Sequence, residues 1–160
     1  MKIQFTKQQN RPSVFKCFRP DGTETWMSIT QLFALEHDIV HYAVETTLGF
    51  RQAFYGMLLR GYNVTDFAAP RHLRPAALLP INLPLEAQQT EMLVNLFQTE
   101  LHDGTSMEDF IGIAKFTFEA QVVPFPDINE QQVGQIRARI RALLRQWHEL
   151  PTGATLELNF

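Results

Sequence analysis

The chain has 160 residues, of which 45% are hydrophobic and 19% charged, the composition of an ordinary globular protein. A net charge of -3 and a pI near 5.9 argue against nucleic-acid binding, because phosphate contacts need a concentrated positive field. The N-terminus MKIQFTKQQN has no apolar signal core, and no run reaches the roughly 20 apolar residues of a membrane helix. We therefore expect a single domain, residues 1–160, that is cytoplasmic and has no membrane partner.

Three stretches near the N-terminus have the composition of β-strands: KIQF, SVFKCFRP and TETWMSI. The second and third flank Pro20-Asp21-Gly22, a turn triplet that predicts a hairpin. The C-terminal tail ATLELNF alternates apolar and polar residues, so we expect it to return and pair with the hairpin. Cys17 is the single cysteine, and its apolar neighbours indicate a core residue in a strand rather than a reactive thiol.

Helical patterns follow the hairpin. Ser28 to Gln31 has the form of a capping box, and the chain reads as helix from Leu35 to about Leu48, where Gly49 ends it. A second helical segment is expected from Phe50 to Arg60. Several prolines then predict a long extended connection over the surface, residues 63–84.

Three longer helices are expected in the second half of the chain. They cover Leu85 to His102, Ser106 to about Ala120, and Ile128 to Leu150, where apolar residues recur every three or four positions. Trp26 and Trp147 both lie in apolar patterns and are predicted core residues. Together the elements predict an α+β fold, in which a small antiparallel sheet of the N-terminal hairpin plus the C-terminal strand packs against four or five helices.

The stretch LEHDIVHYAVE places four titratable residues on an apolar background: His37, Asp38, His41 and Glu45. On a helix they occupy one polar sector about 100° wide. Two histidines at i and i+4 project side by side and can reach one divalent ion. HDIVH also has the spacing of the zinc-peptidase motif H-E-x-x-H, but the shorter Asp38 replaces the glutamate base, which argues against peptidase chemistry.

In the metal hypothesis, His37 and His41 bind zinc, manganese or iron, Glu45 orients His41, and Asp38 takes a proton from bound water. Glu45 would not complete the ligand set, because the helix rises roughly 12 Å between residues 37 and 45. At least one further ligand must then come from another part of the chain. The candidates are His72, Glu91, Glu100 and His102.

Two other interpretations of the cluster stay open. It could be a structural polar helix face, in which His41 and Glu45 make an ordinary i,i+4 pair, or a metal-free acid/base or polar ligand-binding site. At the level of function, the alternatives are metal-assisted hydrolysis and a non-enzymatic interaction module. The partner that we expect is a small-molecule or peptide ligand. In the module, the sheet edge or the stripe of Arg137, Arg141 and Arg145 would contact the partner.

The run LEHDIVHYAVETTLGFRQAFYGMLLRG resembles a pattern found in uncharacterised bacterial proteins, in which L-P-H-D-L-x-H-(F/Y)-x-V-E is followed by L-G and then an aromatic-Gly pair. The matching residues are Leu35, His37, Asp38, His41, Tyr42, Val44, Glu45, Leu48, Gly49, Tyr55 and Gly56. Glu36 stands where the pattern has proline. That family has no assigned activity, so the resemblance implies that this segment is the functional one without implying a reaction.

Overall fold

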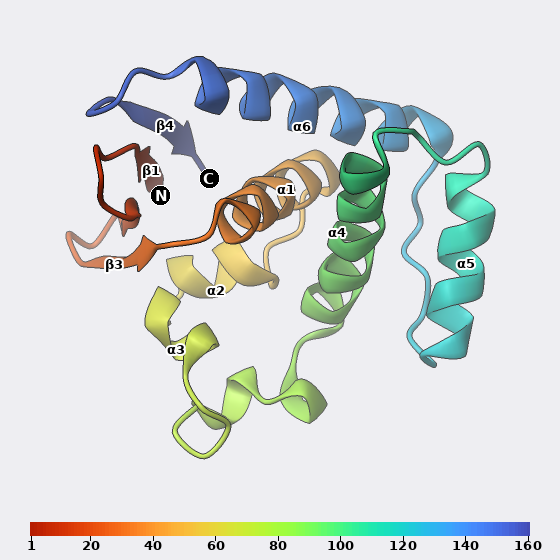
Figure 1. Ribbon diagram of the computed structural model, residues 1–160. Helices are drawn as coiled ribbons and strands as arrows, with labels where there is room; N and C mark the ends of the chain where they lie inside the picture. The colour runs from red at the N-terminus through yellow and green to blue at the C-terminus, as the bar shows by residue number, and fades with distance from the viewer.

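A four-stranded antiparallel sheet joins the two ends of the chain in the computed structural model, which describes residues 1–160 (Figure 1). The strands are β1 (Lys2–Thr6), β2 (Ser13–Phe18), β3 (Glu24–Ile29) and β4 (Thr155–Asn159), in the order β3-β2-β1-β4. Phe5 in β1 lies opposite Phe15 in β2 and Leu156 in β4, so all three side chains share the buried face. The predicted sheet of N-terminal hairpin plus C-terminal strand is confirmed.

Six α-helices and two short 3₁₀ turns make up the rest of the fold, which confirms the α+β class. The helices are α1 (Leu32–Leu48), α2 (Phe54–Leu59), α3 (Val64–Ala68), α4 (Leu85–Asp103), α5 (Phe110–Ala120) and α6 (Glu130–Glu149). The short α3 and the 3₁₀ turns Ala76–Leu78 and Pro80–Asn82 stand where one extended connection was predicted. None of the helices combines the length and the apolar character needed to cross a bilayer.

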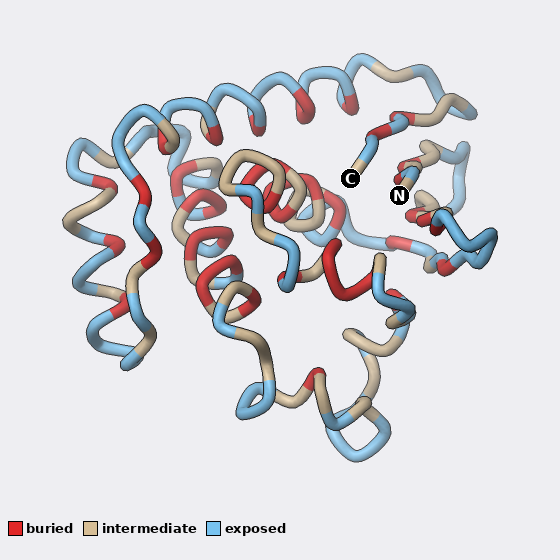
Figure 2. The backbone as a smooth tube through the Cα atoms, turned by 180° about the vertical axis from the view of Figure 1, so that it is seen from behind, coloured by how far each residue is buried: buried red, intermediate tan, exposed pale blue.

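Helix α1 lies at the centre of the molecule, with the sheet, α4 and α6 packed around it (Figure 1). Leu32 and Phe33 in its first turn are about half exposed. Five of its other apolar residues are fully or almost fully buried: Leu35, Ile39, Val40, Ala43 and Val44. Figure 2 shows that α6 is buried along the side facing α1 and exposed on its outer side. A polar side chain on the buried side of α1 must therefore find a partner in the protein or face a cavity.

Three further local predictions were wrong. Helix α5 begins at Phe110 and not at Ser106, because Asp109 is the residue that caps it. Ser28 to Gln31 forms no capping box, because β3 continues to Ile29 and α1 begins at Leu32 without a side-chain cap. Trp26 is 55% exposed because it lies on the face of the sheet that points away from the helices. By contrast, Trp147 is only 3% exposed and confirms its predicted place in the core.

Cys17 is completely buried in β2, and burial raises the pKa of its thiol to about 12. We expect the folded protein to resist iodoacetamide at pH 8, because the reactive thiolate is both scarce and inaccessible. The unfolded chain in urea should react at least roughly a hundredfold faster, since reaction of the folded protein requires local opening. Mass spectrometry of timed samples measures the two rates. Rapid stoichiometric alkylation of the folded chain would contradict this expectation.

Candidate metal centre

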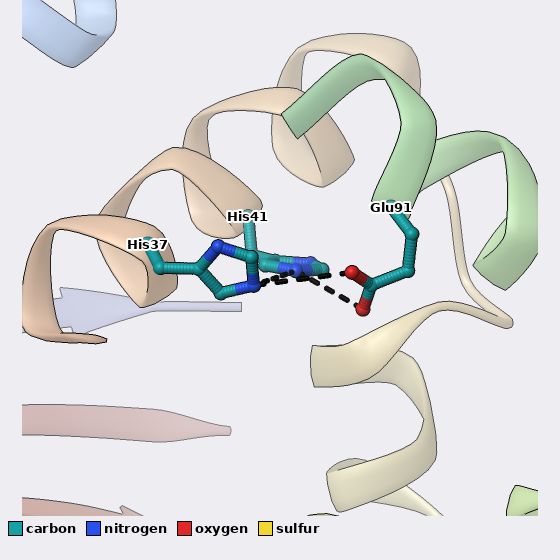
Figure 3. A group of neighbouring side chains, drawn as sticks. All are labelled: His37, His41 and Glu91. Carbon is teal, nitrogen blue, oxygen red and sulfur yellow. Dashed lines mark hydrogen bonds and ion pairs between the residues drawn. The ribbon is translucent and has the colours of Figure 1, made fainter. Parts of the chain in front are cut away.

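His37 and His41 on α1 and Glu91 on α4 point toward one another (Figure 3). The two histidine Nε2 atoms are 3.1 Å apart, and Nε2 of His41 lies 3.3 Å from Oε1 of Glu91. Nε2 of His37 lies 3.9 Å from the other carboxylate oxygen. Donors bound at about 2.1 Å in tetrahedral geometry are about 3.4 Å apart. Two of the three separations are close to this value and the third is longer, so the three side chains form a group that could hold one divalent ion.

The remaining nitrogen of each imidazole faces an acceptor. Nδ1 of His37 donates to the amide oxygen of Gln98 at 2.8 Å. Nδ1 of His41 lies 3.4 Å from Oε1 of Glu45, at ion-pair distance but without hydrogen-bond geometry. Both acceptors favour a hydrogen on Nδ1 and direct the Nε2 atoms toward Glu91. This is the orientation that metal-binding histidines usually receive from their neighbours.

Glu45 is itself held firmly by the start of α2. Its carboxylate is fully buried and accepts the backbone N–H of Tyr55 at 3.0 Å and that of Gly56 at 3.4 Å. These N–H groups lie in the first turn of a helix, where they have no partner within the helix. A Cβ at Gly56 would lie 2.1 Å from the carbonyl oxygen of Arg51, so only glycine fits at this close approach. The contacts with α2 position Glu45 against His41.

The charges around His41 favour a cation. Burial alone would lower the pKa of His41, but the carboxylates of Glu45 and Glu91 raise it to about 10. Burial and the positive charge of His41 lower the pKa of His37. Burial would raise the pKa of Glu91, but its contact with His41 holds that pKa below the ordinary value. Two carboxylates thus surround one protonated imidazole, and the same surroundings would stabilise a divalent ion.

Asp38 lines a cavity of about 700 Å³ together with His37, His41 and Glu91. The Asp38 carboxyl is not one of the three converging donors, and it makes no hydrogen bond or ion pair with another side chain. Burial raises its pKa to about 7, although the positive charge of His41 opposes this shift. A carboxyl group that changes charge near neutral pH is suited to acid/base chemistry.

Among the further ligands considered from the sequence, Glu91 alone reaches the histidines. Glu100 instead accepts two hydrogen bonds from Arg137, at 2.9 and 2.5 Å. The ring of His102 stacks on an aromatic side chain, and His72 is exposed in the connection after α3. Glu91 is the residue that reaches the site because the packing of α4 against α1 directs its side chain toward the two imidazoles.

Gln98 is the part of the site that the sequence analysis missed. It follows Glu91 by seven residues, or about two helical turns, so both side chains lie on the face of α4 that meets α1. Gln98 is 5% exposed. A buried amide on the same helix face as a candidate ligand is a signal that could have identified it.

No protein-family model, curated protein or solved structure matches this chain. The residues of the sequence motif nevertheless form one packed unit. The hydroxyl of Tyr55 donates to the carbonyl oxygen of Asp38 at 2.9 Å, and the ring of Tyr42 packs edge-on against that of Tyr55. Gly49 ends α1 in the left-handed conformation, with φ of 71°, and starts the turn that brings α2 back to Glu45.

Proposed function

We propose that the protein is a metal-dependent hydrolase whose divalent ion is bound by His37, His41 and Glu91. The observation that supports this most strongly is that both imidazoles direct Nε2 toward one point while Gln98 and Glu45 face their Nδ1 atoms. A polar helix face with only a structural role does not require two Nε2 atoms to converge on one point. It does not require a cavity beside these atoms either.

Two nitrogens and one carboxylate oxygen leave coordination positions for water and substrate. Three protein ligands of this kind are typical of catalytic zinc sites, whereas structural zinc sites have four. The same donor set also suits iron(II), and manganese accepts imidazole and carboxylate ligands. No cysteine belongs to the group. Zinc, manganese and iron are therefore the ions to test.

The ion would supply Lewis acidity, which lowers the pKa of bound water and polarises the bond to be cleaved. Asp38 accepts the proton, a role supported by its place in the cavity wall beside the donors. Glu45 and Gln98 hold the two imidazoles in their tautomers. Glu91 is half exposed toward the cavity, so the substrate can approach the ion from that side.

The metal content of protein purified without a histidine tag tests this proposal. We expect the wild type to retain one zinc, manganese or iron ion per chain after exhaustive dialysis, as measured by mass spectrometry of the metal. The variant with His37→Ala and His41→Ala together should retain none. Glu91→Gln should weaken binding by roughly a hundredfold, because it removes a charged donor.

A matched control replaces two histidines outside the site, His72→Ala and His148→Ala, and should keep the full metal content. Circular dichroism establishes that each variant is folded. If the folded wild type binds none of these ions at any concentration tested, the hydrolase proposal fails. The cluster would then be a structural polar face of a non-enzymatic interaction module.

A further inference from the structure

The cavity beside the metal centre has a largely apolar wall. Of the 20 residues that line it, 12 are hydrophobic, including Met57, Phe67, Leu78 and Leu83. Its volume of about 700 Å³ is typical of small-molecule sites, which measure roughly 300–1,000 Å³. The wall suits a small molecule with a substantial apolar part better than it suits a polar polymer.

Arg74 is the only lysine or arginine in this wall. Its Nε and Nη2 atoms donate to the carbonyl oxygen of Ala69, at 3.3 and 3.1 Å. It forms no ion pair with any carboxylate of the protein, and Nη1 has no protein acceptor. The guanidinium is therefore held in place by one backbone oxygen and still has free N–H donors.

A partly buried guanidinium in an apolar wall is stabilised when an anion pairs with it. Its planar set of N–H groups matches carboxylate and phosphate oxygens well. The other titratable groups of the cavity wall are the three converging donors, His37, His41 and Glu91, and the neighbouring Asp38. In the metal-free cavity, protonated His41 is already paired with Glu45 and Glu91, whereas Arg74 has no carboxylate partner. An anion is repelled by Glu91 and by ionised Asp38, and Arg74 is the cation of the wall that is free to pair with it.

We propose that the site takes a small amphipathic molecule whose anionic group pairs with Arg74 and whose apolar part fills the cavity. The position of the bond to be cleaved, beside the metal ion, rests on the proposed function. The pairing with Arg74 does not depend on the metal. A carboxylate and a phosphate offer the same chemistry to the guanidinium, and the experiment separates them.

Calorimetric titration with octanoate, octyl phosphate and octanol tests the proposal. The titration is carried out first on the protein as purified, and again after a chelator has removed any metal and has itself been dialysed away. The wild type should bind at least one of the two anions at least tenfold more tightly than octanol, in both forms. The more tightly bound anion identifies the preferred head group. Arg74→Gln should bring the affinity for that anion down to that for octanol and leave octanol binding within about twofold.

Arg74→Lys keeps the charge without the planar donor set, and should retain part of the preference. Arg71→Gln is the matched control, because Arg71 is exposed in the same connection and does not line the cavity. It should bind all three probes as the wild type does. The proposal is overturned if the wild type binds none of the probes, binds octanol as tightly as the anions, or keeps its preference in folded Arg74→Gln.

Metal content separates this proposal from the previous one. Arg74→Gln should keep its metal, because Arg74 is not one of the donors. If the wild type binds no metal but prefers the anions through Arg74, the hydrolase proposal fails and the anion subsite stands. If metal is bound but Arg74→Gln does not change the preference, the subsite fails and the metal centre stands.

Discussion

Replacing Glu45 with alanine should lower the free energy of unfolding by about 3 kcal/mol and weaken metal binding by roughly 10–100-fold. The stability loss follows from burial, because the backbone N–H groups of Tyr55 and Gly56 would lose their acceptor where water does not reach. The loss in affinity has a separate cause. Without the carboxylate beside Nδ1, the ring of His41 is no longer held in the tautomer that the proposed metal site requires.

Urea unfolding of the metal-free protein and competition with a chelating dye measure the two effects. Glu36→Ala is the matched control, because it removes a carboxylate from the same helix. The Glu36 carboxylate makes only one long contact, 3.9 Å, with Nε2 of His148. That control should change the free energy of unfolding by less than about 0.5 kcal/mol. Glu45→Ala with nearly wild-type stability and affinity would mean that Glu45 does not position His41.

Those parts of the fold that depend on local patterns could be predicted from the sequence. The alternation of apolar and polar residues in the C-terminal tail predicted the strand β4, and Gly49 correctly predicted the end of α1. The positions of His37, His41 and Glu45 within one sector follow from helical geometry alone. Their proximity required no knowledge of how α1 packs.

The parts that depend on packing could not be predicted. Glu91 was one of four further candidates, and choosing it requires the placement of α4 against α1. The contact between Gln98 and His37 joins residues 61 positions apart, and no local pattern reports such a contact. Trp26 was assigned to the core because its strand is apolar, but only the register shows that it lies on the exposed face. Local pattern therefore indicated the two histidines and Glu45, and the tertiary structure added Glu91 and Gln98.

Asp38→Asn should stabilise the metal-free protein by roughly 2–4 kcal/mol above pH 7. Burial raises the pKa of Asp38 from the ordinary value of 3.8 to about 7 in the folded state. The stability that the neutral carboxyl contributes is fully present below pH 3.8 and is lost as the pH rises through about 7. Asparagine stays neutral and has a similar shape, so the variant avoids this loss.

Urea unfolding of both proteins at intervals from pH 4.5 to 8.5 measures the effect. The difference in the free energy of unfolding should be smallest at pH 4.5 and grow until the wild-type carboxyl is ionised. A difference that does not change with pH would contradict the raised pKa. Metal content should remain the same, because Asp38 is not among the three donors. A carboxyl that destabilises the fold at neutral pH but is not among the three donors would fit the role of proton acceptor that we propose for Asp38.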